Sequence, residues 1–221
     1  MNTFYLKSNK IVLSAERGFA YCKLTKLKKI WLFNCSEGCQ HYLAKKQIRI
    51  NQISKIIIAE MNTRNTAGLV GLLSSLSLIN KQSALHVYGP TGLEKYLELA
   101  KKYSQTSFRY NLYFHALKVG YIIENNNYQV FCFKKFEKKP KFEFILKIKE
   151  KSGKFKPRRA ENLKIQAGPL YGKFKKGLKV ILPDGITING NRFNTESQHG
   201  KKISLIMVAD EYVTRQHNET F

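Results

Sequence analysis

Four polar side chains stand where a buried strand is expected to run into a helix. The apolar segment 53–58, ISKIII, is followed by Glu60, Asn62, Arg64 and Asn65, and then by a leucine-rich helix start. A strand that ends in polar side chains at the mouth of a helix is a common place for an active site in an α/β protein. One carboxylate, two amides and one guanidinium are nevertheless an unusual set for catalysis. The rest of the chain must explain what this loop does.

The first half of the chain is expected to alternate strands with helices. Apolar runs bounded by Gly, Ser, Asn or Pro predict buried strands at 29–35, 53–58 and 85–90. Helical spacing of apolar residues predicts helices over 37–48, 68–79 and 92–103. This alternation is typical of an α/β fold. From about residue 121 the pattern changes to strands at 128–133 and 141–148, a Lys/Arg-rich segment over 149–179, and short strand-like pieces at 180–190 and 203–210.

The charge of the chain is high and uneven. The formal net charge is +24, from 39 Lys and Arg against 15 Asp and Glu. Such an excess favours a polyanionic partner, most often nucleic acid and less often an anionic membrane surface. Part of it fits the Lys-rich composition of an A/T-rich genome, such as that of a plastid or endosymbiont. Genome composition acts evenly along a chain, whereas residues 134–179 hold 17 basic and 4 acidic side chains. The clustering therefore needs a local reason.

The sequence shows no membrane span and no targeting segment. No run reaches the ~18 uninterrupted apolar residues that a transmembrane helix needs. The first residues, MNTFYLKSNK, lack the features of a signal or transit peptide. The protein is therefore expected to act in the compartment where it is made.

The four cysteines are scattered at positions 22, 35, 39 and 132. No Cys/His group near Cys35 and Cys39 completes a tetrahedral zinc site. Buried free thiols in a reducing compartment are expected instead.

Four segments of the chain resemble successive blocks of the ribonuclease Z family. They are WLFNCSEGCQHYL at 31–43, SKIIIAEMNTRNTAGLVGLLSSLSL at 54–78, VYGPTGLEKYLELA at 87–100 and AGPLYGKFKKGLKVILPDGITINGNRF at 167–193. They occur in the order of the family and cover most of residues 3–212. The resemblance implies a metallo-β-lactamase-like αββα sandwich, here a single domain over 1–221 that is truncated at its C-terminus. It also implies a tRNA 3′-processing endonuclease with two zinc ions.

The zinc-binding positions of this family carry other residues in this sequence. The resemblance places the HxHxDH motif at 60–65, where Glu60, Asn62, Arg64 and Asn65 stand instead. It places a further ligand histidine at Glu137, and it leaves the aspartate of a GD motif as Asp210. Asn34 stands where the family usually has Asp, and the later His-containing motifs lie beyond residue 221.

These replacements predict that two-metal hydrolysis is lost. An amide oxygen is a weak zinc ligand, and Arg64 puts a fixed cation where two divalent ions would sit. The expected cofactor is therefore none. Two alternatives stay open: a single Mg²⁺ or Mn²⁺ held by Glu60, Glu137 and Asp210, and a decayed site in which Arg64 pairs with Glu60 or Asp210. Whether the chain is an enzyme is left open.

The resemblance also implies an inserted flexible arm over 150–185 that grips tRNA, usually on behalf of the other subunit of a homodimer. The residues expected to contact RNA are Lys154, Lys156, Arg158, Arg159, Lys164, Gly168, Pro169, Tyr171, Lys173, Lys175, Lys176 and Lys179. Lys and Arg contacts to phosphates supply non-specific affinity. The aromatic rings of Phe155, Tyr171 and Phe174 either stack on bases or anchor the arm.

The sequence thus predicts a ribonuclease Z-related, tRNA-binding protein that has lost metal-dependent cleavage. A homodimer, or a heterodimer with a related subunit, and a plastid location are expected. One rival is an active tRNA 3′ endonuclease with a reorganised metal site or a catalytic partner subunit. The other is a non-catalytic dimerisation protein.

Overall fold

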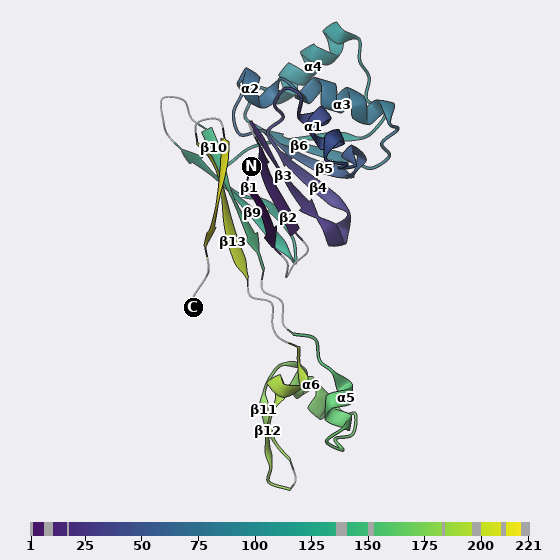
Figure 1. Ribbon diagram of the computed structural model, residues 1–221, viewed down its shortest axis with the longest axis vertical. Helices are drawn as coiled ribbons and strands as arrows, with labels where there is room; N and C mark the ends of the chain where they lie inside the picture. The colour runs from purple at the N-terminus through teal and green to yellow at the C-terminus, as the bar shows by residue number, and fades with distance from the viewer. Residues whose placement is uncertain are drawn as a thin grey trace. The chain divides into compact units, whose positions relative to one another are not determined.

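The computed structural model describes residues 2–6, 11–16, 18–135, 141–149, 153–182, 184–195, 200–208 and 211–217. The chain divides into two units (Figure 1). The first, here called the body, comprises Met1–Lys147 and Lys202–Phe221, and the second, the arm unit, comprises Ile148–Lys201. None of the described helices is long and apolar enough to span a membrane.

The first sheet of the body has seven strands in chain order: β1 (Asn2–Leu6), β2 (Ile11–Glu16), β3 (Phe19–Leu24), β4 (Lys29–Phe33), β5 (Ile53–Ile57), β6 (Leu85–Gly89) and β7 (Leu112–Ala116). Strands β1 to β4 pair antiparallel and β4 to β7 pair parallel. Central parallel strands are covered on both faces, and Ile53, Ile56 and Ile57 of β5 are accordingly fully buried. Because β5 and β6 run parallel, their carboxyl ends lie at the same end of the sheet.

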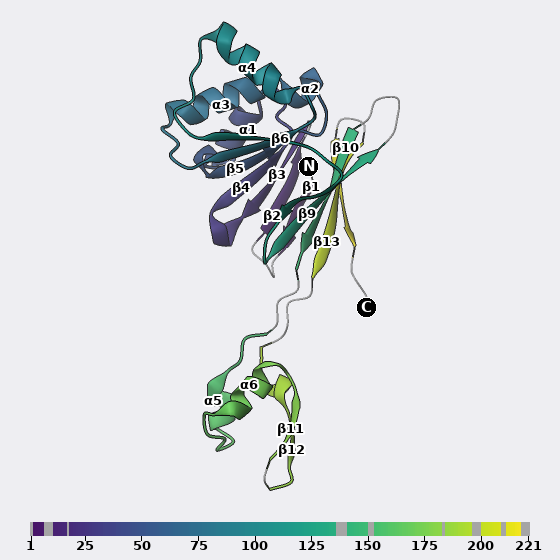
Figure 2. The ribbon, with the colours of Figure 1, turned by 180° about the vertical axis from the view of Figure 1, so that it is seen from behind.

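Four helices accompany the parallel strands and lie on one face of this sheet, as Figures 1 and 2 show: α1 (Cys39–Lys45), α2 (Thr63–Thr66), α3 (Leu69–Leu78) and α4 (Leu93–Ser104). Helix α3 buries Leu69, Leu72, Leu73 and Leu76, whose spacing puts them on one side of the helix. Its start lies close to the loop after β4, since a Cβ on Gly68 would lie 2.2 Å from the Ser36 carbonyl oxygen.

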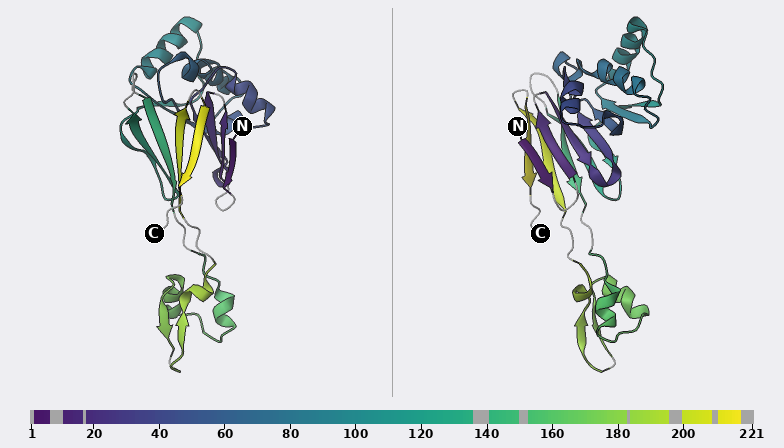
Figure 3. Two further views of the ribbon diagram at one scale, coloured as in Figure 1. Left: turned by 60° about the vertical axis from the view of Figure 1, so that its left-hand side comes forward. Right: turned by 45° about the vertical axis from the view of Figure 1, so that its right-hand side comes forward.

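The second sheet has the strand order β14 (Glu211–His217), β13 (Lys201–Val208), β10 (Lys141–Ile148), β9 (Tyr128–Lys135) and β8 (Gly120–Glu124). It packs face to face on the first sheet (Figure 3). The Phe33 and Phe144 rings lie 5.6 Å apart across this interface, and the Trp31 and Tyr128 rings lie 6.1 Å apart. The body is thus a β-sandwich with helices outside the first sheet. The expected strands at 29–35, 53–58, 85–90, 128–133 and 141–148 and the three expected helices are confirmed.

The arm unit has its own small core. It contains α5 (Pro157–Glu161), α6 (Pro169–Lys175), β11 (Lys179–Ile181), β12 (Thr187–Asn189) and the 3₁₀ turn η4 (Gly190–Phe193). The residues buried together there are Ala160, Ile165, Phe174, Val180, Ile188 and Phe193. Because β12 and η4 complete this core, the unit continues past residue 185, where the sequence placed the end of the arm. These buried residues give the arm unit a packed core of its own.

Candidate functional site

The loop after β5 is held by the side chain of Asn34, which follows β4. Asn34 is fully buried and its backbone is left-handed, with φ of 59°. Its Oδ1 accepts a hydrogen bond from the backbone N–H of Ala59 at 2.8 Å. Its Nδ2 donates to Oδ1 of Asn65 at 3.0 Å. One amide therefore ties the end of β5 to the first turn of α2.

The two asparagines of the candidate site also bond to the backbone of their own loop. Asn62 is the N-cap of α2, and its Oδ1 accepts from the N–H of Asn65 at 2.8 Å. Nδ2 of Asn65 donates to the Glu60 carbonyl oxygen at 3.4 Å, and the Asn65 carbonyl accepts from the Cys35 N–H at 2.8 Å. The amide oxygens of both residues thus already accept a hydrogen bond, that of Asn62 from the Asn65 N–H and that of Asn65 from Asn34.

The charged residues of this loop are more open to solvent. Glu60 is half-buried, whereas Arg64 is exposed. Glu137 and Asp210, the other expected positions, lie outside the described residues, as does any pairing of Arg64 with Asp210. The structure thus places Glu60 and Asn62 in the loop after β5, and Arg64 and Asn65 in the helix α2 that follows it directly.

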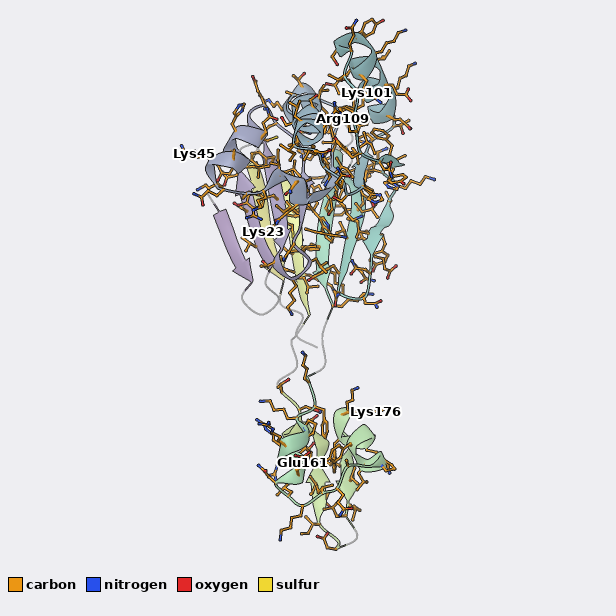
Figure 4. All side chains as sticks on the ribbon, turned by 90° about the vertical axis from the view of Figure 1, so that its right-hand side faces the viewer. Lys23, Lys45, Lys101, Arg109, Glu161 and Lys176 are labelled. Carbon is orange, nitrogen blue, oxygen red and sulfur yellow. The ribbon has the colours of Figure 1, made fainter. Side chains whose placement is uncertain are left out.

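The basic residues expected on the arm are all exposed: Lys154, Lys156, Arg158, Arg159, Lys164, Lys173, Lys175, Lys176 and Lys179. Residues 153–182 hold one acidic side chain, Glu161. Figure 4 labels Glu161 and Lys176 among the side chains of this unit. Arg159 also has a structural part, because its Nη1 donates to the Arg192 carbonyl oxygen at 2.8 Å. Gly168 and Pro169 form the start of α6.

The aromatic residues of the arm pack against one another. Phe174 is fully buried, and its ring lies 4.6 Å from that of Phe193. The rings of Phe155 and Tyr171 lie 5.0 Å apart, and the Tyr171 hydroxyl donates to the Ile165 carbonyl oxygen at 2.9 Å. Of the two roles left open by the sequence, these contacts favour anchoring of the arm.

Comparison with known proteins identifies the family. No family model matches the chain. A Pyropia yezoensis protein named ycf56 is 40% identical over 204 residues, which are 92% of this chain and 76% of that protein. Ribonuclease Z of Acaryochloris marina is 36% identical over 182 residues, which are 82% of this chain and 58% of that protein. The chain belongs to the ribonuclease Z family.

The fold agrees with this membership, and the expected metallo-β-lactamase fold is confirmed. The human tRNase Z, short form, is a structural neighbour with 24% sequence identity and a TM-score of 0.49, covering 62% of this chain and 57% of that one. The chain spans less than two thirds of the ribonuclease Z sequences that it matches, for example 58% of the Acaryochloris protein.

The described residues do not fit the zinc ions that the ribonuclease Z family implies. Within the described ranges no three His, Cys, Asp or Glu side chains come close enough together to hold a metal ion. At the motif itself, the Asn62 and Asn65 amide oxygens are taken by the Asn65 N–H and by the Asn34 amide. Amides are in any case weak ligands for zinc, which binds imidazole, thiolate and carboxylate.

Two of the four thiols lie next to each other. All four cysteines are free and buried, as the sequence predicted. The Cys35 and Cys39 sulfurs lie 3.2 Å apart. Burial raises the pKa of Cys35 well above its ordinary value, while the hydrogen bond from Cys35 lowers the pKa of Cys39.

The amide pair of Asn34 and Asn65 was not predicted from the sequence. One signal points to part of it: Asn34 directly follows an apolar strand, and asparagine is the residue besides glycine that most readily adopts a left-handed conformation. Its partner, 31 residues away in sequence, is visible only in the structure.

Proposed function

We propose that this protein binds tRNA or precursor tRNA through its arm unit and does not cleave it by a two-metal mechanism. The observation that carries the proposal is the amide pair of Asn34 and Asn65, with Nδ2 and Oδ1 3.0 Å apart. These two buried side chains are joined by a hydrogen bond, and together they hold the loop without a metal ion. A ribonuclease Z site reorganised in this way supports the loss of cleavage.

The charge and autonomy of the arm support the RNA-binding half of the proposal. Nine exposed Lys and Arg side chains lie on a unit whose own apolar core fixes their backbone. Cations on a folded scaffold contact phosphates without base identity, and such binding weakens log-linearly with salt. An excess of this kind in one small unit exceeds what genome composition alone supplies.

The location and the assembly of the protein belong to the same proposal. The matched ycf56 proteins come from the red algae Porphyra purpurea and Pyropia yezoensis. Together with the Lys-rich composition, they support a plastid location. A homodimer, or a heterodimer with a related subunit that cleaves, would place the arm on a tRNA held by the other copy.

The test uses a precursor tRNA with a 3′ trailer, incubated with the full chain in Mn²⁺, in Zn²⁺ or in chelator. Binding is measured by electrophoretic mobility shift over a series of salt concentrations, and cleavage on a denaturing gel. We expect a shift without cleavage. Changing Lys173, Lys175 and Lys176 to Ala should weaken binding at least tenfold and reduce the salt slope by about 2–3. Changing the exposed body residues Lys26, Lys45 and Lys95 to Ala is the matched control and should do neither.

Three outcomes would overturn the proposal. Metal-dependent trimming that disappears in Asp210→Ala would mean an active endonuclease with a reorganised site. Equal loss of binding in the arm and body variants would mean that the arm does not select RNA. A dimer whose stability is indifferent to salt and which shows no tRNA shift would favour the dimerisation protein.

A further inference from the structure

A second candidate site lies toward the end of the first sheet at which its parallel strands begin, whereas the loop of Glu60–Asn65 lies at the end at which they finish. It is a pocket of about 560 Å³, within the usual range for small-molecule sites. Residues from the first half of three strands line it: Lys29 and Trp31 of β4, Ser54 and Lys55 of β5, and His86 of β6. The loop of the candidate site follows the last residue of β5, so the two places lie toward opposite ends of this strand.

The pocket is cationic. Lys28, Lys29, Arg49 and Lys55 line it, and no Asp or Glu is among the lining residues. Cations with no acid between them raise the local potential, and a concave surface concentrates it. Lys28 is held at the end of the 3₁₀ turn η2 (Thr25–Leu27) in a left-handed conformation with φ of 51°. The lining therefore suits an anion.

Lys55 is the innermost of these cations. It is half-buried, and the one hydrogen bond described for its ammonium goes to the neutral hydroxyl of Tyr88, at 3.1 Å. Burial lowers its pKa because the charged form loses water. Lys55 pairs in register with Trp31 on one side and His86 on the other, so the three residues lie in a row on one face of the sheet. A bound anion would balance the positive charge of Lys55, whose described hydrogen bond goes to the neutral Tyr88 hydroxyl.

His86 extends this row toward β7. Its Nδ1 lies 3.0 Å from Nε2 of His115, and its ring stacks on that of Tyr113. Burial, and then the charges of Lys55, His115 and Lys29, lower the pKa of His86. The imidazole is therefore neutral near pH 7 and offers a flat ring surface rather than a further charge.

The remaining lining is mixed. It includes the apolar residues Leu24, Leu27, Trp31 and Ala84 and the polar residues Asn51, Gln52, Ser54, Ser83 and Asn125. Leu24 and Trp31 are buried, whereas Leu27 is 46% exposed and is the large apolar side chain that a ligand can reach. On another side the buried ammonium of Lys81 donates to the Asn51 carbonyl and to the Ser83 hydroxyl, both at 2.8 Å. These bonds fix the segment between η3 (Ile50–Gln52) and the start of β6. The shape of the pocket thus does not depend on a partner.

We propose that this pocket binds a nucleotide, with the phosphates against Lys28, Lys29, Arg49 and Lys55 and the base against Leu27, the apolar lining side chain most open to solvent. The cations select an anion, while the volume and this apolar side chain select one that carries a flat, largely apolar group. Inorganic phosphate meets only the first condition, and a nucleoside meets only the second. The ligand is a free nucleotide, and its site is independent of tRNA binding by the arm.

The test uses the only tryptophan of the chain, Trp31, as the reporter. The full-length protein is titrated with ATP, AMP, pyrophosphate and adenosine at constant ionic strength. Tryptophan emission is excited where adenine does not absorb, and isothermal titration calorimetry gives the same affinities independently. We expect saturable binding of ATP or AMP, at least tenfold tighter than that of pyrophosphate or adenosine.

Two variants and one control locate the site. Arg49→Ala changes an exposed side chain and Lys55→Gln a half-buried one, and each should weaken nucleotide binding about tenfold or more. Lys26→Ala removes an exposed lysine of the same turn η2 that does not line the pocket, and it should leave the affinity unchanged.

Three results would overturn the proposal. The first is no saturable signal with millimolar nucleotide. The second is pyrophosphate binding as tight as that of ATP, which would make the pocket a bare phosphate site. The third is a short oligoribonucleotide that binds more tightly than ATP and is displaced by tRNA, which would make the pocket part of an RNA surface.

Discussion

Replacing Asn34 by alanine removes an amide on which two buried groups depend. The Ala59 N–H donates to its Oδ1 at 2.8 Å, and Oδ1 of Asn65 accepts from its Nδ2 at 3.0 Å. A buried polar group left without a partner costs about 1–3 kcal/mol. Alanine also tolerates the left-handed backbone of this position less well than asparagine, by about 1 kcal/mol. With two such groups, the free energy of unfolding should therefore fall by about 3–7 kcal/mol.

The loss can be read from urea unfolding followed by tryptophan fluorescence. Trp31 lies in β4 and is the only tryptophan, so its emission reports the body and not the arm unit. With a denaturant slope of about 2 kcal/mol per molar urea, the midpoint of Asn34→Ala should fall by about 1.5–3.5 M. An unchanged slope would show that stability, rather than the denatured state, has changed.

Asn80 supplies the control for the backbone effect. It has φ of 55°, close to that of Asn34, but its side chain is exposed. Asn80→Ala should therefore cost only about 1 kcal/mol. The Asn34→Ala, Asn65→Ala double-mutant cycle should show a coupling energy of about 1 kcal/mol or more. If Asn34→Ala costs no more than Asn80→Ala, or if the two site variants are additive, the amide pair does not hold the loop.

Three further perturbations follow from the packing and the titratable groups. Gly68→Ala should lower the free energy of unfolding by about 2 kcal/mol or more, because the new Cβ would lie 2.2 Å from the Ser36 carbonyl oxygen. In Gly71→Ala the atom nearest to the new Cβ lies 3.8 Å away, and the free energy of unfolding should rise by up to ~1 kcal/mol. Urea unfolding compares the two variants. Phe174→Ala should lower the stability of the arm unit by about 3–5 kcal/mol, so that a protease cuts within residues 148–201. The urea midpoint of the body, followed by tryptophan fluorescence, should stay unchanged. A shifted midpoint would show that the arm unit does not fold independently of the body. The pKa values of His86 and His115 are lowered, mainly by burial and then by the neighbouring Lys55. Their contribution to the free energy of unfolding is therefore complete above about pH 6.5 and is lost as the pH falls below that value. Changing both residues to Gln should flatten this part of the curve of stability against pH, and an unchanged curve would show that other groups cause it.

The elements that the sequence predicted are those with strong local signals. The segment 53–58 and the leucines of 68–79 have unbroken apolar patterns, and both form the expected strand and helix. Strands β1 to β3 were not predicted, although β2 and β3 are buried, because their polar and apolar residues follow no clean alternation. Their pairing partners, rather than their own residues, define them.

The position of Glu60–Asn65 after a strand was predicted, but the hydrogen bonds that hold this segment were not. The position of Glu60–Asn65 after a strand indicated the loop, and the resemblance indicated which ligands had been replaced. The hydrogen bond between Asn34 and Asn65 joins residues 31 apart, and local patterns carry no information on such pairs. The pocket of Lys28, Arg49 and Lys55 was not predicted either, because these residues are distant in sequence and its lysines do not stand out in a chain with 31 of them.

The core of the arm unit has a consequence for the order in which the chain folds. Strands β10 and β13 are neighbours in the second sheet, yet about 50 residues separate them. Within the arm unit the two ends of this insertion are already joined, by the bridge between Phe155 and Asn194 and by the Lys156 N–H to the Phe193 carbonyl at 2.7 Å. An arm that folds first shortens the loop that β10 and β13 must close, and so saves about 1–1.5 kcal/mol of chain entropy. The core of the arm unit would thus also help the last strands of the body to pair, if the arm unit folds before them.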